Sequence, residues 1–290
     1  MKYQKILNQG SEILKLNNIK SFCLDSELLL SSTLNLDRSS LLLNLDKKIK
    51  IEEKDFFFSL IERRKRNEPL AYITGYKEFW KNKFRVDKNT LIPRPDTEIL
   101  VESVLDELDI SSTKKILDIG TGSGCIILSI LNDRKNCRGV GIDISKKAIK
   151  MAKYNAKIQH IKNRIRFFNS NIDNFYLYKY DVIISNPPYI ELNKIYSLDK
   201  DIRNHEPKVA LNGGVDGYSK IRLVINKSSN LIKKKGKLFL EVGCSQINKT
   251  LEILRLNGFC NNKVIKDLAK RNRCIVSTKI WILKDINEKL

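Results

Sequence analysis

The sequence has almost no histidine and no closely paired cysteines. Among its 290 residues are two histidines and six scattered cysteines, and no Cys-x-x-Cys spacing occurs. Zinc sites use cysteine and histidine at short, regular spacings, and small disulfide-bonded domains carry a far denser set of cysteines. The pattern argues against both, so we expect no metal, reduced thiols and a cytoplasmic location.

Long apolar runs are also missing. No segment has the length and apolarity of a membrane span, and residues 1–16 lack the unbroken apolar core of a signal peptide. Glycine and proline are few, at 13 and 6 residues, which is ordinary for a globular protein. We therefore expect no membrane association, and a chain long enough for one large domain and one small one.

Acidic residues are in the minority, and the formal net charge is +21. Such a balance raises the possibility of a nucleic-acid partner. However, the lysines are spread along the whole chain, whereas a nucleic-acid footprint gathers on one element. The densest run, "IERRKRNEP" at 61–69, ends an amphipathic helix. A nucleic-acid partner is therefore not expected.

The chain has three regions of different pattern. Residues 1–75 carry helical signals in "YQKILNQGSEILKL", "LDSELLLSSTLNL" and "IEEKDFFFSLIERR", although Gly10 weakens the first. Asp25 or Ser26 is the expected N-cap of the second helix. Residues 76–97 read as a β-hairpin turning at Lys81-Asn82, followed by a proline-containing segment. These two regions predict a small helical domain and a hairpin linker.

Residues 98–290 predict an α/β domain. Asp96 or Thr97 is expected to cap a helix that has Glu98 in its first turn. Seven strand-like segments follow, alternating with helical ones: "KKILDIG", "CRGVGID", "RIRFF", "YDVIIS", "GKLFLEVG", "GFCNNKVI" and "RCIVSTKIWIL". This alternation favours a Rossmann-like, mostly parallel seven-stranded sheet with helices on both faces.

The first of these strands leads into a glycine-rich turn, "LDIGTGSGC". Glycine is needed where the backbone turns sharply or approaches a ligand closely. No Lys-Ser/Thr pair follows, so the turn is not a P-loop, and Cys125 stands where a dinucleotide fingerprint has its last glycine. What remains is a carboxylate, Asp118, beside the turn formed by Gly120, Thr121, Gly122, Ser123 and Gly124. It would repel phosphates and suit a ligand that carries an ammonium group.

The next strand ends in Asp143, at the position where a carboxylate typically bonds ribose hydroxyls. A ribose site beside an ammonium site describes a nucleoside with an amino-acid tail. We therefore expect S-adenosylmethionine as the cofactor. The glycine turn alone would be a weak signal, and the agreement of the two features carries the prediction.

A further motif, "SNPPY", directly follows the fourth strand. Two consecutive prolines allow neither helix nor ladder pairing, so they hold Asn186 and Tyr189 in a stiff, extended turn at the strand's carboxyl end. In an open α/β sheet, ligands bind at that edge.

These motifs together resemble the PrmC/HemK family of bacterial release factor glutamine methyltransferases. Further segments support the resemblance: residues 68–102, "NHEPKVALNGGVDGY" at 204–218, "GKLFLEVGCSQ" and "DLAKRNR". It implies a helical substrate-recognition domain (1–75), a hairpin linker (76–97) and a methyltransferase domain (98–290). The family's hairpin usually has glycine where this chain has Lys81, and an aspartate facing the adenine where it has Asn171. An Asn171 carbonyl could still accept a bond from that amine, and Ile172 beside it is expected to contact the cofactor.

The resemblance also implies a substrate, the glutamine of the Gly-Gly-Gln motif of peptide chain release factors. An amide nitrogen is a poor nucleophile because its lone pair is delocalised. The Asn186 side-chain oxygen and the Pro187 carbonyl can accept its two N–H bonds, while Pro187 and Pro188 keep these acceptors rigid. Tyr189 is expected to offer a flat face to the planar amide.

Other functions remain open at this point. The same turn would serve adenine's exocyclic amine in DNA or RNA, although the helical first 75 residues lack interleaved aromatics for base stacking. A non-catalytic protein with a degenerate fold is disfavoured by the intact motif residues. The sister enzyme that modifies a ribosomal protein is disfavoured by "RPDTE" at 94–98, and this last point rests on resemblance.

Overall fold

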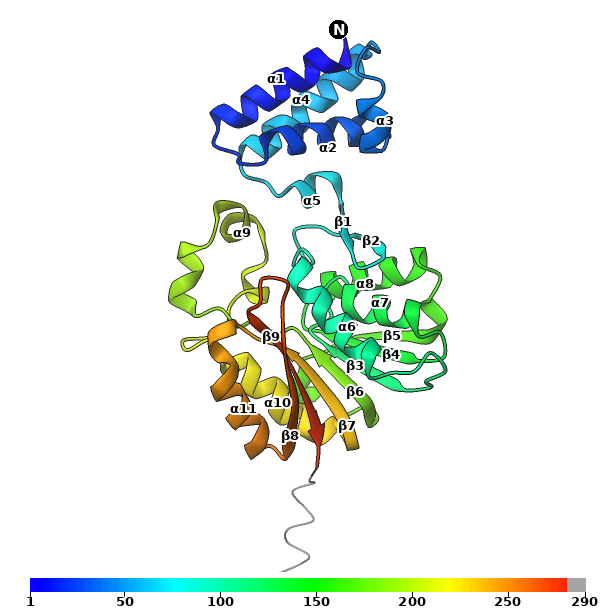
Figure 1. The fold of residues 1–290 in the computed structure, drawn as a ribbon, viewed down its shortest axis with the longest axis vertical. Coiled ribbons are helices and arrows are strands. Elements are labelled where there is room, and N and C mark those ends of the chain that lie inside the picture. Colours follow the sequence, from blue (N-terminus) through cyan, green and yellow to red (C-terminus); the bar gives the residue numbers. More distant parts are fainter. Residues whose placement is uncertain (281–290) are drawn as a thin grey trace, which may run out of the picture. The chain divides into compact units, whose positions relative to one another are not determined.

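The structure is a computed structural model that describes residues 1–280. The chain divides into two compact units. The first comprises Met1–Tyr76 together with Asp199–His205, and the second comprises the remainder. Each unit is described by itself below, with the element labels of Figure 1.

The first unit is a helical domain. Its helices are α1 (Tyr3–Leu16), α2 (Phe22–Leu34), α3 (Arg38–Leu42), α4 (Ile51–Lys65), α5 (Leu70–Thr74) and α9 (Lys200–His205). The three long ones are the three that the sequence predicts. Gly10, which weakens that prediction, is explained by packing: a Cβ there would lie 2.7 Å from the Phe57 ring and from the Ser26 hydroxyl. The close approach of α1 to α2 and α4 therefore requires glycine.

The predicted N-cap of α2 is wrong. The helix begins at Phe22, so Asp25 and Ser26 lie within its first turns and are buried. Asp25 accepts a bond from Arg64 Nε at 2.6 Å, an ion pair whose side chains are only 5% and 11% exposed. Asp25 therefore faces the interior of the helical unit, against α4, whereas a capping residue would face solvent. Two arginines of the basic run at 61–69 therefore form ion pairs within the helical unit, because Arg63 also pairs with Glu68.

The second unit contains a hairpin and an open sheet with helices. The hairpin strands are β1 (Tyr76–Phe79) and β2 (Asn82–Arg85), and the sheet strands are β3 (Lys115–Ile119), β4 (Arg138–Asp143), β5 (Ile165–Asn169), β6 (Tyr180–Ser185), β7 (Ile232–Glu241), β8 (Phe259–Lys266) and β9 (Asn272–Lys279). The helices are α6 (Glu98–Asp106), α7 (Cys125–Asp133), α8 (Lys146–Ile158), α10 (Ser219–Leu231) and α11 (Ile247–Leu256).

The sheet has the order β5-β4-β3-β6-β7-β9-β8. Its first five strands run parallel, and β9 is antiparallel to both of its neighbours. Helices α6, α7 and α8 cover one face, and α10 and α11 cover the other (Figure 1). Consecutive residues of β3 and β6 alternate between the two cores, as the pleat demands. The predicted Rossmann-like fold is confirmed, and the part of the last predicted strand beyond residue 280 lies outside the described residues.

Within the second unit, the turn of the hairpin is bonded to α6 and α7. Trp80, which takes φ +54°, donates its backbone N–H to Glu98 and its indole N–H to Asp133. Lys81 pairs with the same Asp133 carboxylate at 2.8 Å. Lys81 therefore ties the hairpin to α7, and the left-handed backbone of the turn falls on Trp80.

The Asp25–Arg64 pair gives a stability prediction. Asp25→Ala leaves an uncompensated guanidinium in the helical core, so we expect a loss of about 3–5 kcal/mol in the free energy of unfolding. The matched control is Asp46→Ala, which removes an ion pair with Lys2 whose side chains are 94% and 59% exposed. Because water screens that pair, we expect the control to leave the free energy of unfolding nearly unchanged. Urea unfolding followed by circular dichroism measures both, and equal losses would contradict the prediction.

Candidate active site

The candidate site lies at the carboxyl edge of the parallel strands. Ile119 at the end of β3 pairs with Ile142 of β4 and with Ser185 of β6, so the residues that follow these pairs leave the sheet together. Because β3 has β4 on one side and β6 on the other, this is the point where the strand order reverses and where a ligand crevice opens. A cavity lies there.

Most of the predicted site residues line this cavity. The lining includes Gly120, Gly122, Asp143, Asn171, Ile172, Asn186, Pro187 and Pro188. Five predicted residues are absent from it: Asp118, Thr121, Ser123, Gly124 and Tyr189. Thr121, Ser123 and Gly124 belong to the glycine turn itself. Asp118 is buried and bonded to Thr121, and the Tyr189 hydroxyl is directed at Glu241.

The glycine turn depends on left-handed backbone. Gly120, Gly122 and Gly124 have φ of +75°, +56° and +82°, which L side chains rarely adopt. A Cβ at Gly120 would meet no atom within 4 Å, so conformation, and not space, requires glycine there. The N–H groups of Gly120 and Thr121 both donate to the Ile142 carbonyl, at 2.9 and 3.0 Å. These bonds hold the turn against the end of β4.

Asp143 is held by two backbone donors. Its carboxylate accepts the N–H of Gly122 at 2.9 Å and the N–H of Ser145 at 2.8 Å. The pKa of Asp143 is raised above its ordinary value, because the effect of burial exceeds the lowering effect of these two hydrogen bonds. The carboxylate thus has a fixed orientation at the cavity wall, as a group that recognises ribose hydroxyls requires.

Asp118 is buried beneath the turn. The residue is 1% exposed, its Oδ2 accepts the Thr121 hydroxyl at 2.7 Å, and its Oδ1 has no hydrogen-bond partner among residues 1–280. Burial raises the pKa of Asp118 to about 7; the Thr121 bond lowers it, and the nearby Asp143 charge raises it further. A buried carboxyl with an unused oxygen is costly for folding, and an adjoining cationic ligand would offset that cost.

The Asn-Pro-Pro-Tyr turn is connected to α6. Asn186 donates its side-chain N–H to the Thr97 hydroxyl at 3.2 Å. Thr97 occupies the predicted N-cap position of α6, but its side chain makes no capping bond, so that part of the prediction is wrong. With its nitrogen committed to Thr97, the Asn186 amide keeps Oδ1 as its acceptor.

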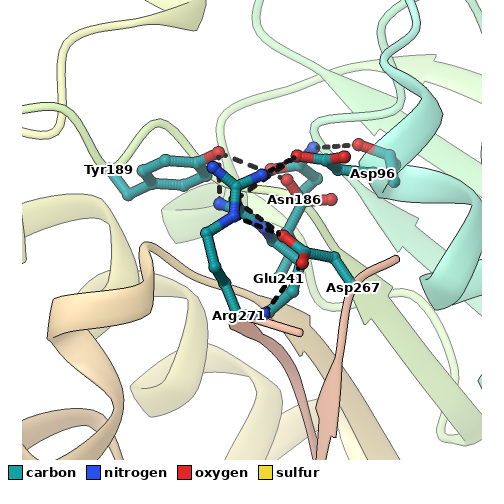
Figure 2. A network of polar contacts seen from close by, with 8 residues as sticks. Asp96, Asn186, Tyr189, Glu241, Asp267 and Arg271 are labelled. Carbon is teal, nitrogen blue, oxygen red and sulfur yellow. Dashed lines mark hydrogen bonds and ion pairs between the residues drawn. The ribbon is translucent and has the colours of Figure 1, made fainter. Parts of the chain in front are cut away.

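Tyr189 belongs to a polar network beside the cavity (Figure 2). Its hydroxyl lies 3.3 Å from Glu241 Oε1 and 3.4 Å from Arg273 Nη1. Burial, followed by the Glu241 charge, raises the pKa of Tyr189 well above its ordinary value. Arg273 also bonds Asp96 and Asp267, and Arg271 bonds the same two carboxylates. The sequence did not indicate this network, because its members lie far apart in the chain.

Two loops also contribute to the cavity without having been predicted as site residues. Asn89, Thr90 and Leu91 come from the linker region, and Pro207, Val209 and Ala210 come from the segment that includes "NHEP". Glu206 connects them, since its carboxylate pairs with Arg94 and accepts the Ile92 N–H at 3.3 Å. The segment at 204–218, which supports the family resemblance, was the signal in the sequence that this loop belongs to the site. The Glu206 carboxylate joins the two loops at one side of the cavity.

Asn171 uses its side-chain oxygen locally. The oxygen accepts the Asp173 N–H at 3.3 Å, at the start of a short 3₁₀ turn. The residue still lines the cavity, next to Ile172. Among residues 1–280, no group of three or more potential metal-ligating side chains gathers, and no helix is both long and apolar enough to span a membrane.

Comparisons with known proteins bear on both units. Residues 5–75 match the family model "PrmC N-terminal domain", and residues 95–255 match "Methyltransferase small domain". Among solved structures, a ribosomal protein L11 methylase from Lactobacillus delbrueckii aligns with TM-score 0.51 at 16% identity, covering 71% of this chain and 91% of that one. A methyltransferase from Pyrococcus furiosus aligns with TM-score 0.52 at 17% identity, covering 68% and 89%. These two structures show the fold alone.

Curated relatives are more specific. A release factor glutamine methyltransferase from Clostridium acetobutylicum is 35% identical over 282 residues, covering 96% of this chain and 99% of that protein. A bifunctional methyltransferase from Rickettsia felis is 35% identical, but this chain spans 58% of its length. The fold and the family models define an S-adenosylmethionine-dependent methyltransferase. Within that class, the chain belongs to the release factor glutamine methyltransferase family.

The cavity fits S-adenosylmethionine, the methyl donor of this class. Asp143 has a fixed carboxylate that would accept bonds from ribose hydroxyls, and Gly120 and Gly122 bring backbone without side chains to the cavity wall. Asp118, the carboxylate expected beside the amino-acid tail, is buried with Oδ1 unpaired and does not line the cavity. When bound, the cofactor supplies an electrophilic methyl group on a sulfonium.

Asp143→Ala tests the proposed ribose contact. Charge-assisted hydrogen bonds contribute roughly 1.5–3 kcal/mol each, so we expect S-adenosylmethionine affinity to fall about ten- to a hundredfold. Isothermal titration calorimetry measures it, with Asp46→Ala as an exposed carboxylate control. Unchanged affinity in Asp143→Ala would remove this residue from the site.

Proposed function

We propose that this protein methylates the side-chain amide nitrogen of the glutamine in the Gly-Gly-Gln motif of peptide chain release factors. Family membership supports the class of substrate. The observation that carries the chemistry is the Asn186 amide at the cavity wall, with its nitrogen bonded to Thr97 and its oxygen left as an acceptor. A cytoplasmic location is part of the proposal, since translation factors work there.

The residues of the turn position the acceptor nitrogen. Asn186 Oδ1 and the Pro187 carbonyl would each accept one N–H of the substrate amide. Held in this way, the nitrogen cannot rotate, and its lone pair is directed at the methyl group. As the nitrogen–methyl bond forms, the sulfonium–methyl bond breaks and its electrons stay on sulfur; the methylated amide then releases one N–H proton to water. Both acceptors stand on rigid backbone, so little reorganisation accompanies the reaction. The two hydrogen bonds strengthen as the nitrogen develops positive charge. They therefore stabilise the transition state more than the bound substrate.

We also propose a division of labour. Residues 1–75 recognise the release factor, residues 76–97 form the linker, and residues 98–290 bind the cofactor and carry the transfer. In support, all the cavity-lining residues belong to the second unit. Asn89, Thr90 and Leu91 of the proposed linker line the same cavity.

Asn186→Ala is the direct test of the chemistry. Cofactor affinity should stay nearly unchanged, while turnover falls on the order of 10²–10³-fold, comparable to the loss of one preorganised donor in an oxyanion hole. Mass spectrometry of a purified release factor should find one added methyl group on the glutamine of Gly-Gly-Gln with the wild-type protein. Label transferred to adenine in added DNA, with the release factor unmodified, would favour an adenine methyltransferase instead.

A chain that begins at Lys77 tests the division of labour. It retains the whole cavity, so calorimetry should find cofactor affinity within about threefold of the full chain, because the deleted residues contribute no lining group. Methylation of intact release factor should become poor through a raised KM. A short peptide containing Gly-Gly-Gln is the control substrate, on which both chains should act equally. Full activity of the shortened chain on intact release factor would refute this division.

A further inference from the structure

The Asn-Pro-Pro-Tyr turn is held at both ends by residues outside the motif. At one end Asn186 donates to the Thr97 hydroxyl at 3.2 Å, and at the other the Tyr189 hydroxyl lies 3.3 Å from Glu241 (Figure 2). Thr97 precedes α6 and Glu241 is the last residue of β7. Neither residue lines the cavity, so neither is expected to touch the cofactor or the substrate.

Glu241 lies level with Asn186 across the sheet. Leu240 of β7 pairs with Ser185 of β6, so Glu241 and Asn186 leave adjacent parallel strands at the same height. Glu241 is 2% exposed, and its Oε2 has no hydrogen-bond partner among residues 1–280. A buried carboxyl that leaves one oxygen unused is a poor structural element, because an apolar side chain would cost less.

Neutralising Arg273 does not account for Glu241. The Arg273 guanidinium already bonds Asp267 at 3.2 Å and Asp96 at 3.4 Å. Arg271 bonds the same two carboxylates, so two guanidinium groups are balanced by two carboxylates without Glu241. The hydrogen-bond partner of Glu241 is the Tyr189 hydroxyl at 3.3 Å. The Thr97 hydroxyl, which holds the Asn186 amide at 3.2 Å, lowers the pKa of the Glu241 carboxyl by hydrogen bonding.

An ionised Glu241 can only accept hydrogen bonds. It therefore turns the hydroxyl hydrogens of Thr97 and Tyr189 toward itself. The Thr97 oxygen is then available as an acceptor for the Asn186 N–H, which leaves Asn186 Oδ1 for another donor. A protonated Glu241 could donate to Thr97 instead, and the Thr97 hydroxyl could then donate to an inverted Asn186 amide. The charge state of Glu241 therefore sets which end of the Asn186 amide is free.

We propose that Glu241 and Thr97 are positioning residues that orient the Asn186 amide so that its oxygen is presented to the substrate nitrogen. This inference rests on the proposed role of Asn186 as an acceptor. It assigns to Thr97 a function in place of helix capping, and to Tyr189 a role as an anchor of the turn through its hydroxyl.

The charge state of Glu241 is sensitive to pH near neutrality. Burial raises its pKa to about 7, while the Thr97 hydrogen bond, the Arg273 charge and the Tyr189 hydrogen bond lower it, and the Asp96 charge raises it. Because the ionised form is the one that orients Asn186, turnover should increase as pH rises through about 7.

Thr97→Val and Thr97→Ser form the matched pair of variants. Valine keeps the branched shape and removes the hydroxyl, and α6 loses no cap, since the Thr97 side chain makes no capping bond. With a purified release factor as substrate, Thr97→Val should lower kcat about ten- to a hundredfold, with KM and cofactor affinity unchanged. Thr97→Ser should restore kcat to within about threefold of wild type. Wild-type kcat in Thr97→Val would overturn the proposal.

A second measurement is independent of activity. Nuclear magnetic resonance of the Asn186 side-chain NH₂, assigned by its loss in Asn186→Ala, should show a signal that shifts with a midpoint near pH 7 in the full chain. The shift should vanish in Glu241→Gln and persist in Asp118→Asn, which removes the other carboxyl with a pKa of about 7. A titration that survives Glu241→Gln would overturn the proposal.

The two measurements separate this inference from the proposed function. If the wild-type protein methylates no release factor, the proposed function fails, and the Asn186 resonance still decides whether Glu241 orients the amide. If release factor is methylated but the Asn186 resonance ignores Glu241 and Thr97→Val keeps wild-type kcat, the function stands and the positioning role is refuted.

Discussion

The candidate site depends on three parallel strands that end at the same level. The pairing of Ile119 with Ile142 and Ser185 fixes this level. A shift of one residue in either pair would turn every side chain of that strand to the opposite face, which the two apolar cores forbid. The glycine turn, the Asp143 carboxylate and the Asn186 turn are far apart in sequence. They share one cavity because the cores on both faces of the sheet hold the register.

This edge of the sheet also concentrates the unfavourable electrostatics of the fold. Asp118 and Glu241 are buried, and burial raises the pKa of each to about 7. A carboxyl whose folded pKa exceeds its unfolded value binds its proton more tightly in the folded state. Its burial therefore lowers stability progressively as pH rises from the unfolded pKa, near 4, to about 7. Both groups reduce stability at neutral pH, which is the pattern expected where a fold maintains charge for binding or catalysis.

The sequence predicts those parts of the site whose chemistry is local. The positive φ of three glycines, the carboxylate that ends β4 and the stiffness of Pro187-Pro188 are all properties of short segments. The fold class follows from alternation of strand and helix patterns along 180 residues or so. Residues that meet only through tertiary packing leave no such signal. Thr97 reads as a helix cap, and Glu241 as the end of a buried strand, until the structure places them at the two ends of one turn.

The same limit explains the wrong prediction at α2. Asp25 and Ser26 have the side chains of capping residues, and local preference favours them at a helix start. The helix begins earlier, at Phe22, and both residues are buried within it. Arg64 of α4 gives Asp25 a charged partner inside the helical unit, and Gly10 leaves room for Ser26 against α1. Capping contributes about 1 kcal/mol, whereas leaving Arg64 unpaired in the core would cost several times more. Where a local preference and a buried charge compete for one residue, the larger of these two energies determines where the helix begins.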